Sequence, residues 1–103
     1  MNFAFKLQAG FFKTRGYLLT IEEDMIVLAP EDGSEEGAQV IEKDELKSFS
    51  IITGNSGAGE VEIVTRDNIY IGSFFYHNAD LDELFRGLAL ELGDKFIFRH
   101  GNI

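Results

Sequence analysis

The sequence has 103 residues, 45% of them hydrophobic and 26% charged, which is the composition of one ordinary globular domain and not of a disordered chain. The net charge of -9 disfavours nucleic acids as partners, and the absence of cysteine excludes disulfides and thiol chemistry. No apolar run approaches the ~20 residues of a membrane span, and the first residues lack a signal-peptide pattern. We therefore expect a single cytoplasmic domain over residues 1–103.

The first third of the chain predicts three strands. Alternating apolar positions indicate a strand over residues 3–12, and Lys13–Gly16 indicates a polar turn after it. Tyr17–Ile21 alternates again and Met25–Ala29 is apolar throughout, so we expect a hairpin around the acidic triplet between them. Pro30 should end this hairpin, because proline cannot donate a hydrogen bond to a sheet ladder.

The middle of the chain predicts four more strands. Phe49 and Ile51 alternate with serine, and Val61 and Ile63 alternate with glutamate, so each strand should have one buried face. The last two strands should form a hairpin. The four strands are expected at 39–41, 47–52 with Thr53 as the alternative last residue, 60–65 and 69–76, separated by loops at 31–38 and 54–59, a bend at 44–46 and a turn at 66–68.

After residue 78 the apolar period changes from two to that of a helix. One stripe contains five large apolar side chains, which predicts an amphipathic helix over about 79–92 that packs on the sheet: Leu81, Leu84, Phe85, Leu88 and Leu92. Asp80 with Glu83 fits an N-terminal capping box, with Asn78 as the alternative cap. Gly93 suits the left-handed position that follows a helix.

The tail over residues 94–103 contains Phe96, Ile97 and Phe98, and is too apolar for a solvated end. Two arrangements remain open at this point. The tail returns along the core as a strand, or it contacts a second subunit.

The order of about seven strands and one helix resembles the pleckstrin-homology-like (PH-like) superfold, and in particular its small bacterial PH and GRAM-like domains. The resemblance covers about residues 3–93. It is carried by Gly16–Thr20 with Met25–Leu28, by Val40–Phe49, and by Val61–Thr65 with Asn68–Ile71 before the helix. It implies a mainly β fold, in which a bent antiparallel sandwich or barrel is capped at one open end by the C-terminal helix.

The same resemblance implies two kinds of function. PH-like domains often bind a peptide beside the helix or at an exposed sheet edge, so we expect a non-enzymatic module that binds a protein or peptide, or a second copy of itself. The candidate surface is formed by Arg86 and Glu91 of the helix and by Phe96 and Phe98 of the tail.

The alternative function is the binding of anionic lipid or phosphoinositide headgroups. PH domains that bind such headgroups carry basic residues in the first hairpin, and Lys6, Lys13 and Arg15 loosely reproduce that pattern. Ammonium and guanidinium groups that converge from two strands can hold phosphate oxygens.

No catalytic constellation is apparent. The glycine-rich segment 54–59 has Ala58 where a nucleophile elbow needs glycine, and it lacks the Lys-Ser/Thr pair of a phosphate loop. His77 with Asp80 and Asp82 offers only a partial set of metal ligands. We therefore predict no enzymatic activity, no cofactor and no metal.

Overall fold

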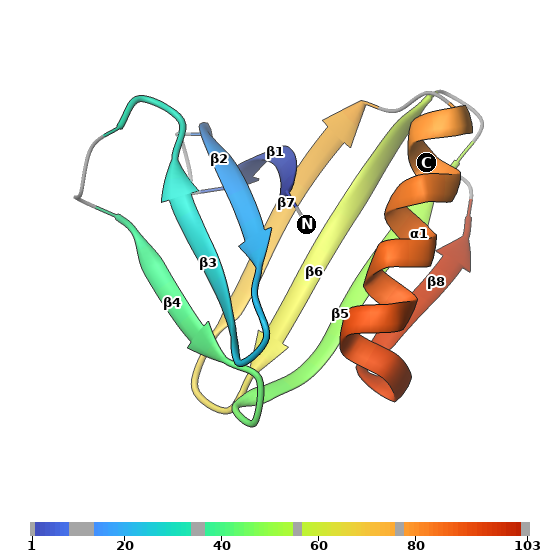
Figure 1. The fold of residues 1–103 in the computed structure, drawn as a ribbon. Helices are drawn as coiled ribbons and strands as arrows, with labels where there is room; N and C mark the ends of the chain where they lie inside the picture. The colour runs from blue at the N-terminus through green and yellow to red at the C-terminus, as the bar shows by residue number, and fades with distance from the viewer. Residues whose placement is uncertain (1, 9–13, 34–36, 55–56, 76–77, 102–103) are drawn as a thin grey trace.

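The computed structural model describes residues 2–8, 14–33, 37–54, 57–75 and 78–101. Eight strands, one α-helix and one short 3₁₀ helix follow one another in these residues, so the fold is mainly β with a C-terminal helix (Figure 1). In chain order they are β1 (Asn2–Gln8), β2 (Thr14–Ile21), β3 (Met25–Pro30), β4 (Gln39–Glu42), β5 (Leu46–Thr53), β6 (Ala58–Thr65), β7 (Ile69–Phe75), α1 (Asn78–Leu92), η1 (Gly93–Lys95) and β8 (Phe96–His100).

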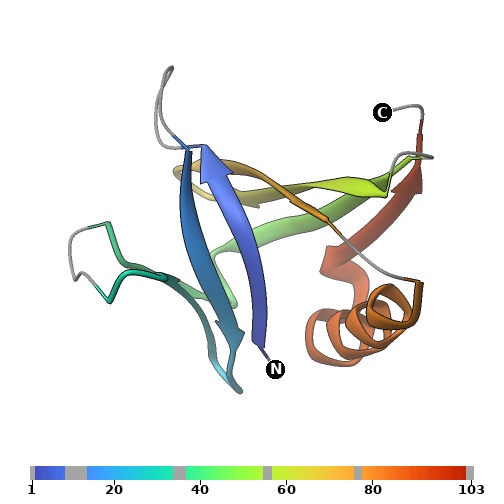
Figure 2. The same cartoon turned by 90° about the horizontal axis from the view of Figure 1, so that it is seen from above.

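Over the described residues, the strands form one sheet in the order β4-β3-β2-β1-β7-β6-β5-β8. Every described pair is antiparallel except β5 with β8, which is parallel. The sheet is strongly bent. Figure 2 shows β1 and β2 running at a steep inclination to β5, β6 and β7, with α1 on the side toward which the sheet bends.

The bend lies where β1 meets β7. Among the described residues their ladder contains two pairs, Lys6 with Ser73 and Leu7 with Gly72, whereas β1 and β2 pair over the full length of β1. On its other side, β7 packs closely against β6. A Cβ added to Gly59 of β6 would lie 2.6 Å from Cζ of Phe74 of β7. Glycine at this position therefore lets the Phe74 ring lie against the β6 backbone.

The core fills the concave side of the bent sheet. It combines alternate residues of β2–β4 with alternate residues of β5–β7, and the predicted helical stripe completes it. Its fully buried members are Leu19, Ile26, Leu28, Phe49, Ile51, Val61, Ile63 and Leu88, with Leu84 and Leu92 nearly so and Leu81 and Phe85 partly buried against them. The burial of this stripe confirms the predicted amphipathic helix.

Two predicted loops are shorter in the structure. Thr14 and Gly16, expected in a turn, belong to β2, where they pair with Gln8 and Lys6 of β1. Ala58 and Gly59, expected in a loop, begin β6 and pair with β7. In both places the backbone hydrogen bonds of the ladder outweigh the turn preference of the glycines.

The tail forms a strand within the chain. Gly93 has a φ of +57° and ends α1 in the left-handed conformation, as predicted. The chain then reverses through η1, and β8 pairs with β5 from Phe96–Phe49 to His100–Thr53. The Lys95 ammonium donates a hydrogen bond to the carbonyl oxygen of Lys43, which ties η1 to the turn before β5.

The only α-helix of the described residues, α1, has 15 residues, which is too short to cross a membrane.

Candidate interaction site

The free edge of β8 is the first feature of the candidate site. Among the described strands, β8 has a neighbour on one side only, which is β5. The N–H of Gly101, just after β8, donates a hydrogen bond to the Thr53 carbonyl at 2.7 Å, so the backbone groups of Gly101 face β5. Because backbone groups alternate sides along a strand, Ile97 and Arg99 also face β5, while Phe98 and His100 direct theirs to the free edge.

An aromatic cluster lies beside this edge, between the strand and the helix. The ring centroid of Phe85, on α1, is 4.3 Å from that of Phe98 and 5.8 Å from that of Phe96, and both pairs are tilted. These are separations at which aromatic pairs attract each other. Phe98 nevertheless keeps 46% of its surface exposed. An apolar side chain placed next to Phe98 would therefore find a partly covered aromatic surface.

The ribbon of β5 and β8 has a local charge opposite to that of the whole chain. Residues 46–53 and 95–101 contain Lys47, Lys95 and Arg99 and no carboxylate. Arg99 is exposed and stands opposite Ile52 on the sheet face away from α1. On the helix face, the Thr53 hydroxyl lies 3.2 Å from Nδ1 of His100 and holds the end of the strand.

The structure separates the four residues expected to form an interaction surface. Phe96 and Phe98 meet at the aromatic cluster. Glu91 points toward the turn before β5, where its carboxylate lies 3.4 Å from the Lys43 ammonium. Arg86 is exposed on a helical position five residues before Glu91, which corresponds to a different direction around the axis.

The basic residues of the first hairpin are described only in part. Lys13 lies outside the described residues, and for Lys6 and Arg15 the structure describes the backbone alone. Lys6 pairs with Gly16, and Arg15 pairs with Leu7. Because neighbouring positions of a strand belong to opposite faces, this register assigns Lys6 and Arg15 to different faces of the sheet.

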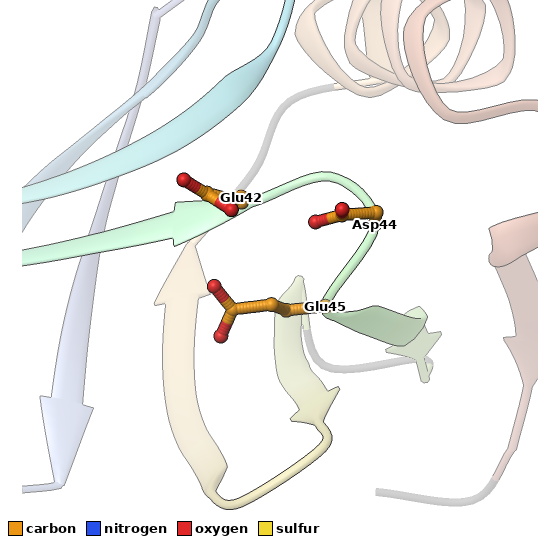
Figure 3. A group of neighbouring side chains, drawn as sticks. All are labelled: Glu42, Asp44 and Glu45. Carbon is orange, nitrogen blue, oxygen red and sulfur yellow. The ribbon is translucent and has the colours of Figure 1, made fainter.

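An acidic group that sequence analysis did not single out lies in the turn between β4 and β5. Figure 3 shows the carboxylates of Glu42, Asp44 and Glu45 around this turn, and one oxygen of each lies within 4.8 Å of the others. Carboxylate oxygens are ligands for hard cations such as Ca²⁺, which takes six to eight oxygens. Three carboxylates supply about half of such a set, and exposed acidic groups are common without an ion.

The partial set of metal ligands around His77 is described for one side chain. His77 lies outside the described residues, as does the side chain of Asp80, and Asp82 is exposed on α1.

From the sequence, an exposed sheet edge was named as a binding place but was not assigned to a strand, because a strand pattern does not show which neighbours a strand will have. The apolar run Phe96–Phe98 had indicated a returning strand as one of two arrangements of the tail. No protein-family model and no curated protein sequence matches the chain.

Proposed function

We propose that this chain is a non-enzymatic PH-like module that binds an extended segment of a protein partner. The observation that carries this proposal is the free edge of β8, which lies beside the half-exposed ring of Phe98. An exposed edge offers unpaired N–H and C=O groups to an incoming strand, and neighbouring side chains supply specificity.

The element order supports the PH-like part of the proposal. Seven strands run from β1 to β7 before the helix, and the β1–β4 half and the β5–β7 half meet at β1 and β7. The resemblance implies a helix that caps one open end of the sheet, and α1 lies on the concave side of the bent sheet (Figure 2). The β8 strand is additional to this pattern and occupies the edge of β5 beside the helix.

A cytoplasmic location belongs to the same proposal. Its support is the lack of cysteine, since domains of this size in oxidising compartments are often held together by disulfides.

Selection of a random peptide library on the immobilised chain tests the proposed function. We expect enrichment of peptides that bind saturably and compete with one another, because they would share one edge. A selection that enriches no peptide above an unrelated immobilised domain would contradict the proposal.

Lipid binding through the first hairpin is the rival function, and co-sedimentation with vesicles containing phosphatidylserine and a phosphoinositide distinguishes it. We expect the chain to stay in the supernatant at physiological salt, because its net charge is -9. Sedimentation that is lost in the Lys13→Glu, Arg15→Glu double variant would favour the rival function instead.

A further inference from the structure

The free edge of β8 combines three properties that together restrict what can pair with it. Its backbone groups at Phe98 and His100 face outward, Phe98 is half-exposed on the helix side, and Arg99 is exposed on the other side. From these properties we infer that β8 binds an acidic extended segment, in which carboxylates alternate with apolar side chains. This inference rests on the proposed function and names the partner's chemistry.

The alternation follows from the two faces of the strand. A strand added beside β8 places successive side chains on opposite faces. Those on the helix side lie next to Phe98, whose ring already contacts Phe85, and an apolar residue there covers surface that is now wet. Those on the opposite side lie next to Arg99, which favours Asp or Glu.

The charged residues of β5 and β8 favour an acidic segment over other partners for the free edge. Strands β5 and β8 contain Lys47 and Arg99 and no carboxylate, and Lys95 of η1 directly precedes β8. The nearest acidic side chain along the row of Arg99 is Glu60 of β6, which lies beyond Ile52. A second β8 strand from another copy would offer no carboxylate to Arg99, because β8 contains none.

The proline variant Phe98→Pro tests the backbone part of the inference. The N–H of Phe98 faces the free edge, so proline removes a donor that a ligand needs and leaves the hydrogen bonds between β5 and β8 in place. Phe98→Ala is the matched control, because it also lacks the ring but keeps the N–H. The probe is a synthetic peptide of ten residues in which Glu and Val alternate, labelled for fluorescence anisotropy.

The charge variant Arg99→Glu tests the side-chain part, and Arg66→Glu is its control. Both change the net charge equally, but Arg66 lies in the turn between β6 and β7. We expect Arg99→Glu to weaken peptide binding at least about tenfold, as the loss of a close charge pair does, and Arg66→Glu to have little effect. A peptide with Lys in place of Glu should not bind at about 0.15 M salt, where the net charge of -9 is screened beyond about 8 Å and the contact with Arg99 decides.

The inference is supported if Phe98→Pro binds the Glu-Val peptide at least about tenfold more weakly than Phe98→Ala, with circular dichroism showing both folded. It is overturned if the two variants bind alike, if the Lys peptide binds as well as the Glu peptide, or if Arg99→Glu binds like the wild type. The inference is also overturned if the wild type forms dimers that the Phe98→Pro substitution abolishes, because the segment bound at β8 would then be a second copy of the chain. Should Phe98→Pro unfold, Arg99→Glu and the two peptides decide alone.

The two proposals fail in different ways. If the random library enriches peptides that lack acidic alternation, or that bind Phe98→Pro normally, the inference about β8 fails while the proposed peptide-binding function stands. If the library enriches nothing, both fail.

Discussion

At the scale of single residues, Tyr70 is a group whose pKa differs between the folded and the unfolded state. It lies on β7 and is partly buried against the core, and its hydroxyl lies 3.5 Å from Oε1 of Gln39, on β4. Burial raises the pKa of Tyr70 above its usual value, and the nearby Glu45 carboxylate raises it further, while a hydrogen bond with the Asn68 side chain lowers it. The phenol therefore joins the two halves of the bent sheet.

This raised pKa predicts a loss of stability in alkali. Below pH 10.0, the ordinary value for tyrosine, the phenol is protonated in both the folded and the unfolded state, and its contribution to stability is fully present. As pH rises above 10.0, the unfolded state loses its proton first, so the free energy of unfolding falls until the folded phenol also ionises. We expect urea unfolding between about pH 8 and 11 to show a steeper decline for the wild type than for Tyr70→Phe.

Absorbance of tyrosinate near 295 nm gives an independent measurement. A tyrosine titration step above pH 10.0 in the folded protein should disappear in Tyr70→Phe. Equal decline of stability in the two proteins, together with the loss of a titration step at pH 10.0 rather than above it, would show that burial does not act on this phenol.

At the scale of elements, α1 is held by its buried stripe and not by its exposed face. Leu88 has no exposed surface, whereas Leu90, two positions later, is 82% exposed. The two residues have the same chemistry and the same helix propensity. They therefore separate the contribution of packing from that of the helix itself.

We expect Leu88→Ala to lower the free energy of unfolding by about 2–5 kcal/mol, because it leaves a cavity between the helix and the sheet. Leu90→Ala should change it by less than about 0.5 kcal/mol. Urea unfolding followed by circular dichroism measures both. A similar loss in the two variants would mean that α1 does not pack through the stripe that contains Leu88.

At the scale of the whole molecule, the excess of acidic residues opposes the compact state. The radius of gyration is 13.0 Å, about the value for a compact chain of 100 residues, so the net charge of -9 is confined to a small volume. The acidic residues gather in the turns after β2 and β3 and between β4 and β5, where three carboxylates lie within 4.8 Å of one another. Like charges this close repel each other more strongly when the protein is folded.

Salt should therefore stabilise this protein. Added NaCl shortens the screening length from about 30 Å at 0.01 M to about 8 Å at 0.15 M, so we expect the thermal midpoint to rise over this range and then to level off. Sucrose at matched osmolality is the control for effects that do not depend on charge. A midpoint that stays constant or falls with NaCl would show that repulsion does not limit stability.

Much of the fold could be predicted from local pattern. Alternation with period two, apolar runs and turn residues predicted the seven strands before the helix, and the spacing of Leu81 to Leu92 predicted α1, because these patterns reflect which side of one element is buried. The predicted ends of the strands were less accurate. Gly16 and Gly59 have turn chemistry, yet their backbones pair in ladders that depend on residues elsewhere in the chain.

The candidate site was less predictable. Phe96 and Phe98 were expected at an interaction surface, and their contact with Phe85 depends on how α1 lies against β8. The carboxylates of Glu42, Asp44 and Glu45 converge only because the turn after β4 is tight. Contact between a lipid headgroup and Lys6, Lys13 and Arg15 of the first hairpin stays a prediction.

The amino-acid sequence by itself determined the class of fold, the face that each element buries and the charge of the molecule, because these depend on the order and type of neighbouring residues. Only the tertiary structure decided that the tail pairs with β5, that β8 rather than β5 has the free edge, and that a basic ribbon lies within an acidic protein. The physical reason is that strand pairing joins backbone groups whose hydrogen bonds are alike at every residue, so packing between distant segments selects the partner.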